Sequence, residues 1–566
     1  MMKKFTCITL CLIAIPLLGI SQTNSTSPGK RIDVTNVGIL NNSEADQTTV
    51  IQNVIESASA GDTLFFPEGE YLIRSLQLKS GVHILSEGIL KHHPNAKIGQ
   101  FSIEKQNSPN PLIIGRGVKD LSISIRAKSK NEGIYLWKSH QIRIYDSEIV
   151  GDSTKSSSHP GIMTFESSGI EIDHVEIRNF GIAREKTNSY HPGSGIRILS
   201  SNTISIRNSE IYQNGENGVF IHGSRKVEVI NNVIRHNGMS GIQVAFGPSG
   251  KERDYIFSDN ILDSNAADAI DINNRSEKDP MDIECLISAN ITCDNGYVGN
   301  ESTPDGSGIV TLINVSNVII YKNEAYRNNR PAIYLESCGI ILARENKADN
   351  QVEITLGLDE FLMVKNSFGS VNLIANTDAN SIYILDNKLG SISLPNGIQV
   401  NELVIEKNLL SNASLNLNME GQVRIIDNII KNKSKNPAIL IVKAGEAIIE
   451  NNEILSLNAS AIVLRPTAQN VELINNKIES IDTGIFDENS KSLLVQDNTI
   501  TSLSGGEKNQ AFRSHYPRNL TLTGNEYHGI SEQVTVLLVG NGQAKVSDEK
   551  LVSGTVDYGE VKISKN

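Results

Sequence analysis

The chain has 566 residues, of which 39% are hydrophobic, 20% charged and only 5% aromatic. This balance excludes a disordered chain and an integral membrane protein. The formal net charge of -12 argues against nucleic acid as a partner, because phosphate binding needs a positive field. An acidic polysaccharide stays open, since a local basic cleft or a bound divalent cation can hold one.

The first 22 residues have the pattern of a secretory signal peptide. Lys3 and Lys4 form a basic start, the stretch 5–20 is apolar and too short to span a membrane, and Gly19 and Ser21 offer a cleavage site. We therefore expect an exported protein, periplasmic or secreted, of a Gram-negative-type bacterium, without membrane insertion after cleavage. The mature chain, 23–566, keeps three cysteines, which is too few for a disulfide framework.

Residues 30–90 have the features of an end cap. The stretch 45–60 can form a short amphipathic helix, and DTLFFPEGEYLI (62–73) and LKSGVHILSEG (78–88) then begin a sheet. A cap is needed because a stack of strands exposes unpaired edges at its ends. The segment 541–566 is expected to close the other end. With coils over 91–540 and no convincing linker, we expect one domain.

One repeated motif dominates the chain: four residues that tend to alternate apolar and polar, then any residue, then Asn. Asn tolerates a left-handed turn and bonds neighbouring backbone, so stacked copies predict a ladder of amides. A unit this short cannot bury its own face, and burial must come from neighbouring units, as in a solenoid. The repeated residues are Asn232, Asn260, Asn290, Asn323, Asn346, Asn366, Asn387, Asn408, Asn428, Asn452, Asn476, Asn498 and Asn525.

A second strand pattern, Gly-Ile-x-Ile with variations, lies between the Asn strands. Two strands per unit and a short third predict a parallel β-helix. Its copies begin at Gly133, Gly161, Gly195, Gly218, Gly241, Ala269, Gly308 and Ala332.

The opening of the mature chain, DVTNVGI (33–39), a helix and DTLFFPEGEYLI, resembles the pectate-lyase-like superfamily of right-handed parallel β-helix proteins. The resemblance covers nearly the whole mature chain. It implies an all-β fold, a single-stranded right-handed solenoid with a short N-terminal cap helix. It does not fix the reaction, because the superfamily hosts lyases, hydrolases, epimerases and phage adhesins. The sequence lacks the usual polygalacturonase and epimerase signatures, and it is most similar to bacterial polysaccharide lyases acting on uronic acids.

Four excursions add residues to the coils: 181–193, 246–254, 274–282 and 295–305. Loops on a rigid scaffold carry binding groups, so these should wall a cleft. If the apolar residues of the second pattern face inward, their neighbours form two outward columns on the cleft floor. The first column holds Tyr135, Met163, Arg197, Phe220, Gln243, Asp271 and Tyr334. The second holds Trp137, Phe165, Leu199, His222, Ala245, Asn273 and Glu336.

These columns contain the parts for β-elimination on a uronate, which needs a carboxylate neutraliser, a base for the C5 proton and an acid for the leaving oxygen. Arg197 could neutralise the carboxylate, and His222, Tyr190 or His191 could serve as acid or base. The plain alternatives are a solvated histidine, a loop tyrosine, and an arginine that bridges to acidic neighbours. The expected substrate-binding residues are Gln243, Arg253, Arg275, Lys278 and Tyr334, with Trp137 and Phe165 as a sugar-stacking platform.

The sequence therefore predicts a carbon–oxygen lyase on uronic-acid-containing poly- or oligosaccharides, either a polysaccharide lyase or a dehydratase. One alternative is a glycoside hydrolase that uses Asp271 with Glu336 or with Asp268. Another is a non-catalytic carbohydrate-binding protein. Asp268 and Asp271 could also bind Ca²⁺, the one cofactor considered. The expected partner is an acidic poly- or oligosaccharide, with no nucleic acid, and the chain is expected to be a monomer.

Overall fold

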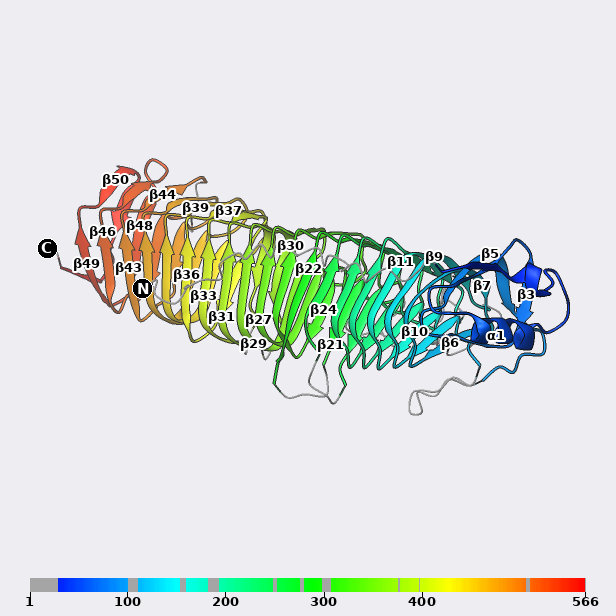
Figure 1. Cartoon of the computed structure of the whole chain (residues 1–566). Helices are drawn as coiled ribbons and strands as arrows, with labels where there is room; N and C mark the ends of the chain where they lie inside the picture. The colour runs from blue at the N-terminus through cyan, green and yellow to red at the C-terminus, as the bar shows by residue number, and fades with distance from the viewer. Residues whose placement is uncertain are drawn as a thin grey trace.

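The computed structural model describes residues 29–99, 110–152, 159–181, 193–247, 252–274, 279–297, 307–374, 377–395, 398–504 and 509–564. The strands of this part stack into a long rod, with α1 at one end and β49 (Gln543–Ser547) near the other (Figure 1). The predicted all-β, right-handed parallel β-helix is confirmed. The predicted signal peptide lies outside the described residues, as do Tyr190, His191, Arg275 and Lys278.

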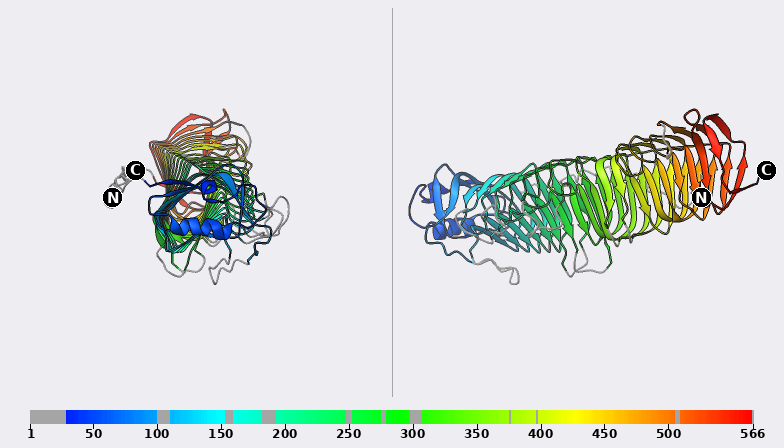
Figure 2. Two further views of the ribbon diagram at one scale, coloured as in Figure 1. Left: turned by 45° about the vertical axis from the view of Figure 1, so that its right-hand side comes forward. Right: turned by 180° about the vertical axis from the view of Figure 1, so that it is seen from behind.

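The N-terminal cap begins with β1 (Arg31–Asp33) and a 3-10 turn, η1 (Val34–Val37). The predicted helix is α1 (Thr48–Ser57), which buries Ile51 and Ile55 against the end of the core. Strands β2 (Thr63–Phe66) and β5 (His83–His92) then start the parallel stack. Both further views place α1 at the terminal coils of the rod (Figure 2). None of the helices in the described ranges is long and apolar enough to span a membrane.

Each coil contributes three strands to three parallel sheets. In one coil these are β12 (Ile196–Leu199), β13 (Asn202–Arg207) and β14 (Glu210–Tyr212). They pair in parallel with β15 (Val219–His222), β16 (Arg225–Ile230) and β17 (Val233–Arg235) of the next coil. We call these the first, second and third sheets. Alternate apolar side chains point into the coil, so one continuous core runs along the rod.

The predicted asparagine ladder is confirmed at the corner between the second and third sheets. The Asn366 side-chain nitrogen donates to Asn387 Oδ1 at 3.0 Å, and Asn387 donates to Asn408 at 3.2 Å. The same bond links every repeated Asn from Asn232 to Asn525. Asn525 donates to Glu549 at 3.0 Å, which continues the ladder with a carboxylate. Each buried amide is thereby satisfied by its neighbours.

A second, shorter ladder was not predicted from the sequence. Asn214, Asn237, Asn265, Asn295 and Asn328 bond to one another at another corner of the coils. Among the described residues, Cys285, Cys293 and Cys338 are free cysteines. Cys285 and Cys338 are packed in the core, where burial raises the pKa of both thiols.

Candidate functional site

The outward residues of the first sheet lie in the predicted register. Strands β8 (Ile134–Trp137), β10 (Ile162–Phe165), β12, β15, β18 (Ile242–Ala245) and β21 (Ile270–Asn273) pair in sequence. Strand β24 (Val310–Ile313) places Thr311 between Asp271 and Tyr334, a coil that the predicted columns left out. Successive members of a column are about 4.8 Å apart, the spacing of paired strands.

The N-terminal part of these columns is a covered apolar layer, not an open floor. Ile114, Tyr135, Met163 and Leu199 are buried outside the coil core, and Trp137, Phe165 and Phe220 pack against them. The Trp137 and Phe165 rings stack with centroids 6.5 Å apart. Both rings are half-buried, so the expected sugar-stacking role stays a prediction that would use only their outer edges.

Arg197 is 4% exposed and forms a buried ion pair with Glu216, which comes from the turn before the next coil. Ser194 Oγ donates to the same Glu216 oxygen at 2.5 Å, and the Arg197 guanidinium lies 4.7 Å from the centre of the Phe220 ring. This is the bridging alternative that the sequence left open. Because a buried arginine gives up a carboxylate partner only at a cost, Arg197 is a poor free neutraliser for a uronate. Sequence reasoning missed Glu216.

His222 is held in one orientation. Its ring stacks on Phe220 with centroids 6.4 Å apart, and its Nδ1 lies 3.1 Å from the carbonyl oxygen of Ala245. In the neutral ring Nδ1 therefore carries the proton and Nε2 is the acceptor. A Cβ placed on Gly247 would lie 3.2 Å from His222 Nε2 and 3.3 Å from Glu252 Oε1, so the imidazole and the buried Glu252 carboxylate both lie next to Gly247. The sequence did not single out Glu252.

Asp268 and Asp271 are two interacting carboxyls at the start of β21 in the first sheet. Asp268 Oδ1 accepts hydrogen bonds from the Ser307 backbone and, at 2.8 Å, from the Thr311 hydroxyl. Burial, and next the charge of Asp271, raise the pKa of Asp268 well above its usual range. The two carboxyls are 5% and 8% exposed, and the opposing hydrogen bonds and Arg330 do not offset the burial. Burial and a neighbouring negative charge both favour the protonated form of Asp268.

A polar chain leads to this pair along the first column. The Asn217 side-chain amide donates to Gln243 Oε1 at 2.9 Å, and Gln243 Nε2 donates to Asp271 Oδ2 at 2.8 Å. Further along the rod, the Tyr334 hydroxyl donates to Glu336 at 2.9 Å. The amide of Gln243 on the preceding coil therefore holds the Asp271 carboxylate in place. Glu336 lies two coils further along the rod than Asp271.

The remaining predicted residues are not gathered at this pair. Arg253 is exposed and pairs with Glu284 and, at 3.5 Å, with Asp254, so its charge is compensated. Among the described residues, Asp263, Cys293 and Asp294 are the one group of three whose possible metal-ligand atoms lie within 4.8 Å of one another, and this group includes neither Asp268 nor Asp271. The Asp268–Asp271 pair offers few oxygen ligands where Ca²⁺ takes six to eight, so calcium stays a prediction.

Comparisons with known proteins agree with this architecture. A family model described as a right handed beta helix region matches residues 118–280 and 413–559, which is more than half of the chain. A second model, described as rhamnogalacturonase A/epimerase, pectate lyase-like, matches residues 31–181. No curated protein matches the chain.

Several solved structures share the fold at low identity. The surface adhesin PfbA of Streptococcus pneumoniae is 15% identical over 66% of this chain and 93% of its own, with a TM-score of 0.41. The polygalacturonase of Erwinia carotovora is 12% identical over 67% of this chain and 99% of its own, with a TM-score of 0.36. The mannuronan C-5 epimerase AlgE4 A-module of Azotobacter vinelandii is 13% identical over 93% and 99%, with a TM-score of 0.31. Such distant likenesses say nothing about the reaction.

Proposed function

The chain belongs to the right-handed β-helix family, with a pectate-lyase-like N-terminal part, and we propose that it is a carbohydrate-active enzyme. We further propose that it is a glycoside hydrolase whose acid and base are Asp268 and Asp271. One observation carries this proposal: two nearly buried carboxyls lie at one strand end of the first sheet, where burial and the charge of Asp271 raise the pKa of Asp268. Glycosidases need one carboxyl protonated and one ionised near neutral pH, and environments that separate two pKa values supply both.

The hydrogen bonds of the two carboxyls support one division of roles. Asp268 receives its two described hydrogen bonds at Oδ1, which leaves Oδ2 to carry the proton that would go to the glycosidic oxygen. Asp271, oriented by Gln243, would remain ionised and act either as the nucleophile or as the base for water. As the base, Asp271 would take a proton from the water that replaces the leaving sugar at the anomeric carbon. As the nucleophile, it would itself bond to that carbon as the sugar leaves, and water would then hydrolyse this bond. The separation of the two carboxyls that act together would decide between retention and inversion.

β-Elimination on a uronate is the second candidate, and the fixed tautomer of His222 favours it. Nε2 of a neutral histidine can take the C5 proton, and Arg197 lies on the adjacent coil. Expulsion of a sugar would make the protein a polysaccharide lyase, and expulsion of water a dehydratase. The ion pair of Arg197 with Glu216 speaks against this candidate, because the uronate carboxylate would have to compete with Glu216.

Product analysis on uronate-rich and neutral polysaccharides separates the candidates. Purified mature protein is incubated with each substrate, with and without a chelator, and the products are examined by mass spectrometry and ultraviolet absorbance. Chain shortening with gain of water and no new absorbance supports the hydrolase. New absorbance from an unsaturated uronate contradicts it and supports elimination. Binding without any turnover contradicts both and leaves a non-catalytic carbohydrate-binding protein. Loss of activity with the chelator supports a bound cation.

A further inference from the structure

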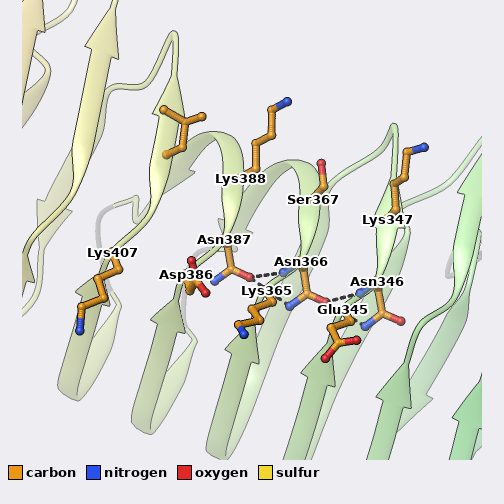
Figure 3. A pocket seen from close by; sticks show the side chains of 11 residues that line it. Glu345, Asn346, Lys347, Lys365, Asn366, Ser367, Asp386, Asn387, Lys388 and Lys407 are labelled. Carbon is orange, nitrogen blue, oxygen red and sulfur yellow. Dashed lines mark hydrogen bonds between the residues drawn. The ribbon is translucent and has the colours of Figure 1, made fainter.

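Five consecutive coils each place one lysine beside the asparagine ladder, on alternating sides of it. Lys322 precedes its ladder residue, Lys347 follows, Lys365 precedes, Lys388 follows and Lys407 precedes, and all five are exposed. Figure 3 shows Lys347 and Lys388 on one side of the row Asn346, Asn366 and Asn387, with Lys365 and Lys407 on the other. The alternation is therefore a property of the surface and not only of the sequence.

The fold fixes the two sides. The residue before each ladder Asn adopts a left-handed conformation, with φ of 57° at both Lys365 and Lys407, directly after the strand of the second sheet. The residue after it starts a third-sheet strand, so Lys347 pairs with Ser367, and Ser367 with Lys388. Lysines on one side are thus two coils apart, about 9.6 Å, and successive lysines advance by one coil, about 4.8 Å.

These lysines line a shallow groove. A cavity of about 430 Å³ lies along the ladder, and its charged lining is Lys347, Lys365, Lys388, Lys407, Glu345 and Asp386. Glu345 is engaged by Arg344 at 2.9 Å and by Lys322 at 3.7 Å, and Lys407 pairs with Glu406 at 2.7 Å. Within the described part of the chain, neither Lys365 nor Lys388 has an ion-pair partner within 4.0 Å. Asp386 is the one lining acid without a described ion pair, so the groove carries excess positive charge.

We infer that this groove is an accessory binding site for a linear anionic polysaccharide, of the kind in which successive β-1,4-linked uronic acids are turned by half a revolution. Such a ribbon projects its carboxylates to alternate sides, and each sugar advances it by a length close to the spacing of the coils. One carboxylate would contact one lysine per coil, because the advance per sugar is close to the spacing between successive lysines along the rod. Charge-assisted hydrogen bonds are stronger than neutral ones, so an extended chain that makes one such contact per coil gains the most.

This groove is distinct from the proposed hydrolase site, and it fits a polyuronate better than a nucleic acid. It lies between the second and third sheets, whereas Asp268 and Asp271 lie on the first sheet, so the inference does not rest on the proposed hydrolase. Nucleic acid fits less well, because its phosphates follow one another at about 3.4 Å per strand and the chain has a net charge of -12.

The test is calorimetric binding of polymannuronate, a β-1,4-linked polyuronate, to the full mature chain at low salt. Poly-L-glutamate, α-linked polygalacturonate and single-stranded DNA serve as polyanions of other geometry. Three variants are compared: a quadruple Lys347→Gln/Lys365→Gln/Lys388→Gln/Lys407→Gln, a swap Lys365→Ser/Ser367→Lys, and Lys477→Gln. The swap keeps the net charge but moves one lysine across the ladder. Lys477 also follows a ladder Asn, but it pairs with Glu479 at 3.1 Å, so it is the matched control.

We expect polymannuronate to bind the parent chain and to weaken at least about tenfold in the quadruple variant, since each exposed pair contributes a factor of a few. The swap should weaken binding by about threefold, and Lys477→Gln should leave it unchanged. Circular dichroism and the thermal midpoint verify that the variants fold. No binding by the parent, or unchanged binding by the quadruple variant, overturns the inference. Equal affinity for polyglutamate or DNA, or an unaffected swap, also overturns it, because the groove would then attract any polyanion.

Discussion

The hydroxyl of Thr311 donates a hydrogen bond to Asp268 Oδ1 over 2.8 Å, from the coil that follows Asp268 in the first sheet. This bond stabilises the ionised form of Asp268 and opposes the burial that raises its pKa. Thr311→Val keeps the shape and removes the donor. We expect the pKa of Asp268 to rise further, so the alkaline limb of the pH–kcat profile should move to higher pH if Asp268 is the general acid. A limb that stays in place contradicts that role.

His92 provides a prediction about stability. Burial lowers the pKa of His92 from 6.5 to about 4, and its Nδ1 accepts from the Lys130 backbone at 2.9 Å. The neutral ring stabilises the fold above pH 6.5, and this contribution is lost as the pH falls toward 4, because the unfolded chain takes up the proton first. The loss should be on the order of 3 kcal/mol. Urea unfolding of His92→Gln should show less acid destabilisation over this range, and an unchanged pH dependence contradicts the assignment.

The asparagine ladder predicts a large cost for one internal member. Asn387→Ala removes the acceptor for the Asn366 backbone and side chain and leaves the Met363 carbonyl without its donor. Leaving such buried groups unsatisfied should lower the free energy of unfolding by about 3 kcal/mol. Asn401→Ala, at an exposed Asn–Asn contact, is the control and should change little. Equal effects of the two substitutions in urea unfolding would show that the ladder adds no stability of its own.

Gly247 separates the two candidate reactions. A Cβ at this position would lie 3.2 Å from His222 Nε2, so Gly247→Ala should displace the imidazole. A lyase that uses His222 as base should lose kcat by about 100-fold, whereas a hydrolase based on Asp268 should be nearly unaffected. Gly357→Ala, where the nearest atom lies 3.8 Å from the added Cβ, checks that a glycine substitution alone is harmless. The same substrate is used for both variants, and a strong loss would contradict the hydrolase.

The sequence repeats were sufficient to predict the fold, but they predicted only part of the candidate site. Asn366 and its equivalents recur at one fixed turn, and Arg197, Phe220 and Gln243 follow from strand period alone, so their stacking could be predicted. The residues that contact them from the turns and loops could not be predicted in this way. Glu216 reaches Arg197 from a turn, and Glu252 reaches Gly247 from across an excursion, so neither contact leaves a periodic signal. The sequence also suggested an open floor, because the period shows which residues face outward but not what covers Met163 and Leu199.

The most direct test of the central claim is the kcat of Asp268→Asn on whichever polysaccharide the parent chain hydrolyses. Asp487 supplies the matched control, since it is 1% exposed and accepts hydrogen bonds from Ser490 and Ser514 far from the site. If Asp268 is the general acid, Asp268→Asn should lose at least about 100-fold in kcat while Asp487→Asn loses little. Activity of Asp268→Asn within about threefold of the parent, with Asp487→Asn equally active, would contradict the acid–base role of the Asp268–Asp271 pair.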